Sequence, residues 1–242
     1  MLPAERGCTG NTLRLMPYTP PSRVPRAAGA RRPAAPTVPA SLTGTVSEIT
    51  DDGVYTNSLF DGCDLAGRKA ESVEIDTCRM SSVDLSGGRL TRAMVTNAVI
   101  DRSNLANLQA MNSSLIRVEL TTNRMTGISW TNGRLRDVTF RDCRLDLARF
   151  RSTTASNVLF AGSNLRQADF QDADLRGATF EDCDLTGVQF SGAKMDGTRL
   201  LNCVLVGVNG VMSMAGAAVA SRDMVALAYS LAGAVGITVL DE

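Results

Sequence analysis

Apolar residues recur at every fifth position along most of the chain. Between Phe60 and Leu205, all 30 positions whose number is divisible by five hold Ala, Val, Ile, Leu, Met, Phe or Trp. With 44% hydrophobic residues in the chain, chance would give this run with a probability on the order of 10⁻¹¹. A spacing of five scatters residues around an α-helix and alternates them between the faces of a straight strand. The chain must therefore turn within each five-residue unit, so that every apolar side chain returns to one interior.

Two further positions of each unit support this winding. Two residues before the apolar position i, at i−2, the residue is usually small or compact, as in Cys63, Val83 and Ala168. Residues two apart on an extended segment share a face, so i−2 and i are both predicted to point inward. Arg68 also occupies an i−2 position, and a buried arginine is costly, so we expect a distorted turn at residues 66–72. Position i+2 is rich in Gly, Asn and Asp, which favour tight corners.

The segment SNLRQ ADFQD ADLRG ATFED CDLTG, from Ser163 to Gly187, resembles the pentapeptide-repeat family, whose unit reads roughly Ala-(Asp/Asn)-Leu-X-X. The resemblance covers residues 55 to 208. It implies an all-β fold, a right-handed quadrilateral β-helix with four units in each turn. Thirty units would then make about 7.5 turns and a rod roughly 36 Å long, at about 4.8 Å per turn.

Four units per turn would make residues twenty apart stacked neighbours. From this register we predict two aromatic ladders, one of Phe140, Phe160 and Phe180 and one of Phe150, Phe170 and Phe190. The register also stacks opposite charges at the surface in three places: Arg149 with Asp169, Asp146 with Arg166, and Arg117 with Asp137. We expect each of these pairs to attract across neighbouring turns.

Composition divides the chain into residues 1–40, 41–210 and 211–242. Residues 1–40 hold all eight prolines and six arginines against one acid, Glu5, so we expect a disordered tail. The tail is either an electrostatic arm for nucleic acid or an acidic partner, a dispensable linker, or a product of a start codon placed before Met16. Arg31 and Arg32 precede Pro-Ala-Ala-Pro rather than an apolar run, so no export signal is predicted.

After the repeats, residues 221–236 are predicted to form a helix, with Ser221 as N-cap and Asp223 in the first turn. Its predicted apolar stripe comprises Val225, Ala228, Leu231 and Ala232. Because a β-helix ends in an open core, we expect this helix to cap it. The uncharged stretch from Met224 to Leu240 is short and rich in alanine, so a cap is favoured over a membrane span. In several family members the cap joins two rods, which implies a homodimer here.

The available chemistry argues against catalysis. Histidine, the commonest general base and zinc ligand, is absent from the sequence. Five cysteines occupy i−2 and are predicted to face inward as small hydrophobes: Cys63, Cys78, Cys143, Cys183 and Cys203. Cys183 and Cys203 would be stacked neighbours, so a disulfide between them is the alternative to reduced thiols. We predict no enzyme activity, no cofactor, no metal and no small-molecule substrate.

Charged residues gather in two neighbouring segments of the later repeats. The candidate interaction surface comprises Arg134, Arg136, Arg141, Arg144, Arg149, Arg151, Asp169, Asp172, Asp174, Glu181, Asp182 and Asp184. In one interpretation the arginines bind phosphates or an acidic protein; in the other they belong to a charge-balanced surface. The aspartates are also the residues that the repeat itself places at its turns.

The predicted function is a non-enzymatic scaffold or protein-interaction module in the cytoplasm of a bacterium, with a protein partner. The alternative comes from the quinolone-resistance branch of the family, whose members resemble DNA and bind DNA gyrase. Such mimicry needs a strongly acidic surface, whereas residues 51–210 hold 20 acidic and 18 basic residues, a net charge of −2. A DNA duplex of about 36 Å carries roughly 21 negative charges, so mimicry would be limited to a short acidic patch.

Overall fold

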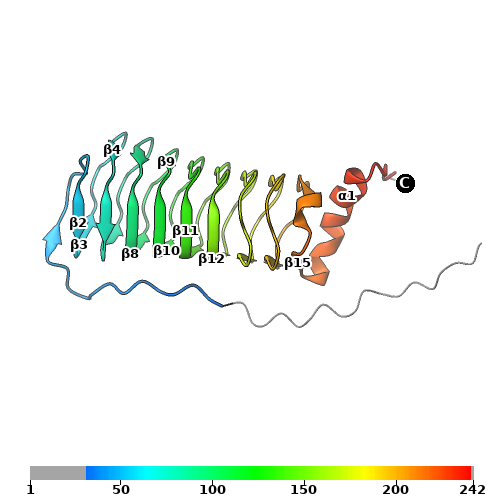
Figure 1. Cartoon of the computed structure of the whole chain (residues 1–242), viewed down its shortest axis with the longest axis horizontal. Coiled ribbons are helices and arrows are strands. Elements are labelled where there is room, and N and C mark those ends of the chain that lie inside the picture. Colours follow the sequence, from blue (N-terminus) through cyan, green and yellow to red (C-terminus); the bar gives the residue numbers. More distant parts are fainter. Residues whose placement is uncertain (1–30, 241–242) are drawn as a thin grey trace, which may run out of the picture.

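The computed structural model describes residues 31–240, so residues 1–30 of the predicted tail, including Cys8, lie outside the described residues. From β1 to β15 the chain winds as a parallel β-solenoid, with the strands of successive turns side by side (Figure 1). The solenoid predicted from the five-residue period is confirmed.

Short strands form the walls of the solenoid. They are β1 (Gly44–Thr45), β2 (Val54–Thr56), β3 (Ser58–Asp61), β4 (Lys69–Glu71), β5 (Glu74–Asp76), β6 (Arg79–Ser81), β7 (Arg89–Thr91), β8 (Met94–Asp101), β9 (Gln109–Met111), β10 (Ser114–Thr121), β11 (Arg134–Arg141), β12 (Thr154–Ala161), β13 (Thr179–Glu181), β14 (Arg199–Leu201) and β15 (Ala218–Val219). The main sheet runs in the order β1-β3-β6-β8-β10-β11-β12-β13-β14-β15, and β4-β7-β9 form a separate three-stranded sheet.

Strand pairs within the solenoid keep a register of twenty residues. Leu115 lies opposite Leu135, and Phe140 lies opposite Phe160. Twenty residues are four five-residue units, so the expected four units per turn are confirmed. The register shifts at both ends, where Gly44 lies opposite Ser58 and Arg199 opposite Ala218.

A left-handed backbone conformation forms the corner of each unit. Every i+2 residue from Asp52 to Gly207 has a positive φ, between 49° and 74°. Glycine occupies some of these positions, and at Gly162 a Cβ would lie 2.4 Å from Oδ1 of Asp142. Larger residues such as Leu147 (φ 59°) accept the same conformation, which costs L-residues about 1–2 kcal/mol. The corner predicted from Gly, Asn and Asp therefore occurs in every unit, whichever residue occupies position i+2.

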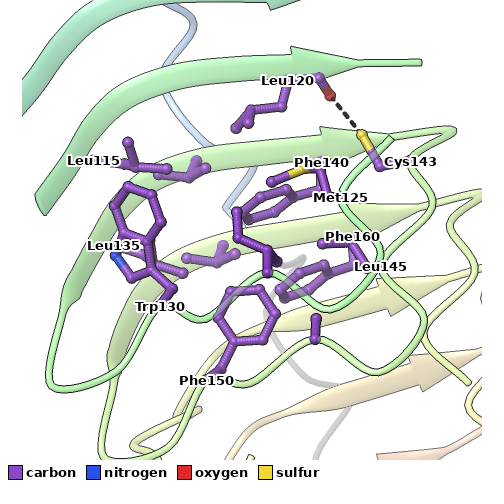
Figure 2. Close-up of a cluster of buried hydrophobic side chains, with 14 of the residues drawn as sticks. Leu115, Leu120, Met125, Trp130, Leu135, Phe140, Cys143, Leu145, Phe150 and Phe160 are labelled. Carbon is purple, nitrogen blue, oxygen red and sulfur yellow. Dashed lines mark hydrogen bonds between the residues drawn. The ribbon is translucent and has the colours of Figure 1, made fainter. Parts of the chain in front are cut away.

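The interior consists of the side chains at position i. All 30 of them between Phe60 and Leu205 are buried, and the most exposed, Trp130, is 7% exposed. Figure 2 shows several of these side chains pointing toward one another from different walls of the solenoid.

Both predicted aromatic ladders are present. The Phe140 and Phe160 rings stack with centroids 4.7 Å apart and an interplanar angle of 4°, and Phe160 stacks on Phe180 in the same way. Phe150, Phe170 and Phe190 form the second ladder. Rings of the two ladders also meet edge to face, as do Phe150 and Phe160 at 6.0 Å. Edge-to-face and stacked pairs contribute beyond their buried area, so the two ladders join opposite walls.

Position i−2 carries buried hydrogen bonds that the sequence pattern did not predict. Oδ1 of Asn123 accepts the Ser103 N–H, and Nδ2 donates to the Ile100 carbonyl, both at 2.8 Å. Cys143 Sγ donates to the Leu120 carbonyl at 3.5 Å (Figure 2). The inward cysteines are therefore more than the small hydrophobes predicted, because their thiols bond the backbone of the preceding turn. Within residues 31–240, no buried side-chain nitrogen or oxygen lacks a hydrogen-bond partner.

The distortion predicted around Arg68 is wrong. Its side chain turns outward, is about half exposed, and pairs with Glu48 at 3.0 Å. The Arg68 N–H bonds the Leu65 carbonyl, and the Arg68 carbonyl accepts the Arg89 N–H, as at neighbouring corners. An exposed ion pair removes the need to bury the charge, so the turn stays regular.

Both ends of the core are covered by residues outside the repeats. At the start, Ile49, which precedes the repeats, is buried, and the Tyr55 ring of the first unit meets Phe60 edge to face at 5.6 Å. At the other end lie two 3₁₀ helices, η1 (Val211–Met214) and η2 (Ser221–Asp223), and the helix α1 (Met224–Ala234), which follows the last turn (Figure 1). Within residues 31–240, no helix has the length and apolar character needed to cross a membrane.

The predicted capping helix is confirmed, but its predicted orientation is wrong. Ser221 makes no side-chain cap; it lies in η2. Asp223 is buried instead, and its Oδ2 accepts the N–H of Cys203, twenty residues earlier, at 2.9 Å. This bond fixes the rotation of α1 so that Leu227, one helical turn on, faces the core. Val225 and Ala228 of the predicted apolar stripe are therefore exposed.

Replacing Phe160 by Ala should destabilise the solenoid by about 3–5 kcal/mol, because Phe160 contacts rings of both ladders. Val206→Ala, at a half-exposed valine, is the matched control and should change stability by about 0.5 kcal/mol or less. Denaturant unfolding followed by circular dichroism measures both. Equal losses in the two variants would contradict this assignment of the core.

Replacing Asp223 by Ala should lower the stability of the C-terminal end by about 1–3 kcal/mol, because the buried Cys203 N–H loses its acceptor. Asp223→Asn keeps an acceptor oxygen and should retain most of that stability. Hydrogen exchange of the Cys203 amide measures the effect. An Asn variant that exchanges as fast as the Ala variant would show that the hydrogen bond does not hold the cap.

Candidate interaction surface

The outward side chains form columns, because residues twenty apart lie on one line along the rod. The four faces are named here after their buried residues in one turn: the Leu135, Phe140, Leu145 and Phe150 faces. Each face presents the residues at i−1 and i+1 on either side of its buried column. Corners at i+2 separate the faces.

The six predicted arginines surround one turn and do not form a single patch. Their sequence numbers place Arg134 and Arg136 on the Leu135 face, Arg141 on the Phe140 face, Arg144 on the Leu145 face, and Arg149 and Arg151 on the Phe150 face. A single ligand on one face therefore meets at most two of them. Their role in binding stays a prediction.

The predicted acidic residues are dispersed in the same way. They comprise Asp169 on the Phe150 face, Asp174 on the Leu135 face, Glu181 on the Phe140 face, Asp184 on the Leu145 face, and Asp172 and Asp182 at corners. Asp169, Asp174 and Asp184 each accept the backbone N–H two residues later, at 2.9, 3.3 and 3.0 Å. These three carboxylates thus hold the turns of the repeat, which is the turn role that the sequence also allowed.

Hydrogen bonds keep two of these carboxyls acidic. The hydrogen bond donated by Arg176 lowers the pKa of Asp174, against the opposing effect of partial burial. Burial raises the pKa of Asp184, but hydrogen bonds from Thr186 and Arg166 outweigh it, so this pKa also lies below its ordinary value. Both groups are therefore ionised at neutral pH.

Arg149 and Asp169 are stacked in adjacent turns, as predicted. Within residues 31–240, however, none of the three predicted ion pairs forms. Asp169 pairs with Arg151 at 2.5 Å, and Arg166 pairs with Asp184 at 3.1 Å. Both pairs are separated by eighteen residues. In the third predicted pair, Arg117 does not bind Asp137. It donates a hydrogen bond to Asn97 at 2.6 Å instead. The long arginine side chain reaches diagonally to the neighbouring turn.

Residues 31–36 of the predicted tail lie along the Phe140 face, so the predicted disorder does not extend to them (Figure 1). The Ala34 N–H bonds Asp137 at 3.2 Å, and the Arg32 carbonyl accepts a bond from Asn157 at 3.3 Å. Leu159 points outward at i−1 but is only 4% exposed, because Arg32 and Pro33 lie against it. Within residues 31–240, this segment covers part of the Phe140 face, and no comparable segment covers the other three.

Residues 134–210 match the family model described as a pentapeptide repeat region. This segment belongs to the pentapeptide-repeat family. No curated protein matches the chain.

Solved structures of other pentapeptide-repeat and related proteins resemble it only distantly. A trypsin-treated form of QnrB1, a plasmid-mediated fluoroquinolone resistance protein, is 19% identical, with a TM-score of 0.45 over 81% of this chain and 100% of that one. HetL, involved in heterocyst differentiation regulation in the cyanobacterium Nostoc sp. strain PCC 7120, is 15% identical, with a TM-score of 0.27 over 69% and 85%. The fold assignment rests on the strand register rather than on these similarities.

The five cysteines of this pentapeptide-repeat protein that lie in the described residues are free thiols, so the disulfide alternative for Cys183 and Cys203 is not formed. Burial raises the pKa of Cys143 to about 11. The neighbouring Cys203 thiol, together with burial, raises the pKa of Cys183. Among residues 31–240, no group of three or more His, Cys, Asp or Glu side chains is placed to hold a metal ion.

The Leu145 face brings together charges that lie far apart in the sequence. Arg124, Arg144 and Arg166 line one shallow hollow with Leu147. Of these, only Arg144 belongs to the predicted surface. The overlooked signal is the spacing of twenty between Arg124 and Arg144, which places the two side chains in one column.

Proposed function

We propose that this pentapeptide-repeat protein is a non-enzymatic scaffold or protein-interaction module. The observation that carries the proposal is the fixed grid of outward side chains on three open faces. Since each residue at i−1 or i+1 adjoins a buried residue at i, its position is set by the core. Such a surface is organised before binding, so a partner loses little free energy in ordering it. Residence in the cytoplasm of a bacterium belongs to the same proposal and rests on the sequence alone.

The DNA-mimic alternative has weaker support. A duplex carries about one negative charge per 1.7 Å without interruption. The i−1 column of the Leu145 face instead changes sign along the rod, reading Asp64, Asp84, Asn104, Arg124, Arg144, Asn164, Asp184 and Val204. A partner selected by this surface meets both signs of charge, as protein partners commonly do.

A face-specific capture experiment tests the proposal. Four single variants each reverse one charge on one face: Arg136→Glu, Arg141→Glu, Arg144→Glu and Arg149→Glu. The purified wild type should retain a defined protein from native lysate of the organism that encodes it, and one variant should lose that protein while the others keep it. Retention of no specific protein, or equal retention by all four folded variants, would overturn the proposed function.

We also infer that the C-terminal cap joins two copies of the chain. The outer side of the cap exposes several apolar residues: Met224 (40%), Val225 (73%), Tyr229 (61%), Val235 (64%) and Ile237 (59%). They follow one another at the end of the rod, where α1 lies (Figure 1). Contiguous exposed apolar surface of this kind favours association, and a twofold contact between identical ends would cover it.

Light scattering after size-exclusion chromatography tests the dimer. The wild type should have about twice the monomer mass of 25.7 kDa. The double variant Val225→Glu, Tyr229→Glu should be monomeric, whereas Val54→Glu, at a similarly exposed valine in the first turn, should remain dimeric. A monomeric wild type at 100 µM, a concentration of about the order that weak dimers need, would rule out the inferred contact.

A further inference from the structure

Two arginines are stacked directly on each other at the centre of the Leu145 face. Arg124 and Arg144 occupy the same i−1 column in adjacent turns, joined by a parallel backbone bridge. Like charges directly opposite in neighbouring strands destabilise a sheet. The stack therefore works against the stability of the solenoid.

The two arginines also displace a turn hydrogen bond. In the turns on either side, Asn104 and Asn164 occupy the same column, and each accepts the N–H two residues later, at 3.3 and 3.0 Å. An arginine side chain has no acceptor, so it cannot make this bond. An amide at either position would suit the fold better.

The nearby carboxylates have other partners, although that of Asp146 keeps its charge and lines the same hollow. Asp146 accepts a hydrogen bond from the Thr126 hydroxyl at 2.9 Å, and Asp184 pairs with Arg166 at 3.1 Å. Within residues 31–240, neither Arg124 nor Arg144 forms an ion pair. Both side chains are exposed, so their guanidinium groups are open to a ligand.

An exposed apolar side chain lies in the same hollow. Leu147 occupies a left-handed corner (φ 59°) that favours glycine, and it is 51% exposed. It lines the hollow with Thr126, Asn164 and Gln167. The hollow thus combines two unpaired cations, uncharged hydrogen-bonding groups and one apolar contact with the paired Arg166 and one carboxylate, that of Asp146.

We propose that this hollow binds a short acidic segment of a protein partner. Adjacent carboxylates of the segment pair with Arg124 and Arg144, and an apolar side chain beside them packs on Leu147. Guanidinium groups suit this role because their parallel N–H groups match the two oxygens of a carboxylate. The inference rests on the proposed interaction function and adds which face binds and what chemistry it selects.

The column favours a short ligand over a nucleic acid. Asp84 and Asp184 lie in this column on either side of the two arginines, and five turns of about 4.8 Å separate them by roughly 24 Å. A polyanion that extended along the face would meet both carboxylates and be repelled. Tight nucleic-acid binding also uses about 6–10 phosphate contacts, more than this hollow provides.

Fluorescence anisotropy of the full chain tests the proposal with a fluorescein-labelled peptide that carries two adjacent glutamates followed by a leucine. The wild type should bind it, and R124Q/R144Q should bind at least about tenfold more weakly. The control R134Q/R136Q removes the same charge from the Leu135 face and should bind like the wild type. The melting temperature of R124Q/R144Q should equal or exceed that of the wild type, because the repulsion is removed.

Three outcomes would overturn the proposal: no binding by the wild type at millimolar peptide, equal weakening in both double variants, or tighter Arg124- and Arg144-dependent binding of a single-stranded oligonucleotide. A lower melting temperature in R124Q/R144Q would assign the two arginines a structural role instead. In the capture experiment, loss of the partner in a variant other than Arg144→Glu would overturn this inference and leave the proposed function standing.

Discussion

The contact between each inward side chain and its equivalent one turn away determines the rest of the structure. Phe140 and Phe160 stack at 4.7 Å, which matches the spacing that backbone hydrogen bonds impose on neighbouring strands. Side-chain stacking and backbone pairing therefore favour the same geometry. A slip of one residue would expose an entire buried column, so the register of twenty is held from β2 to β14.

The core could be predicted because its rule is repeated in each unit. Position i accepts only apolar residues, and the corner at i+2 recurs whatever residue occupies it, as Leu147 illustrates. The sequence pattern predicts only part of the role of position i−2. Residues such as Cys143 and Asn123 are compact enough to fit a packing pattern, but their bonds to the preceding turn depend on the direction of backbone groups. Composition does not reveal that direction.

The surface could not be predicted from neighbourhood in the sequence. Five residues along the chain lead to a different face, so Arg144 and Arg149 are separated by a corner, whereas Arg124 and Arg144 are adjacent. Ion pairs such as Arg151 with Asp169 also depend on side-chain reach, which favours a diagonal partner over the stacked one. The orientation of α1 likewise follows from one buried hydrogen bond, which the Cys203 N–H donates to Asp223. The helical spacing of apolar residues does not predict this bond.

Because the interior carries the stability, the outward positions are free to hold residues that the fold does not favour. Asn104 and Asn164 are the residues that suit the turn on the Leu145 face, since each bonds the backbone that follows it. Arg124 and Arg144 give up that bond and repel each other, yet Met125 and Leu145 beside them remain buried. In a solenoid, an outward residue that weakens its own turn is not explained by the stability of the fold, so binding is the remaining explanation. Such a residue therefore identifies a candidate site even where no cleft exists.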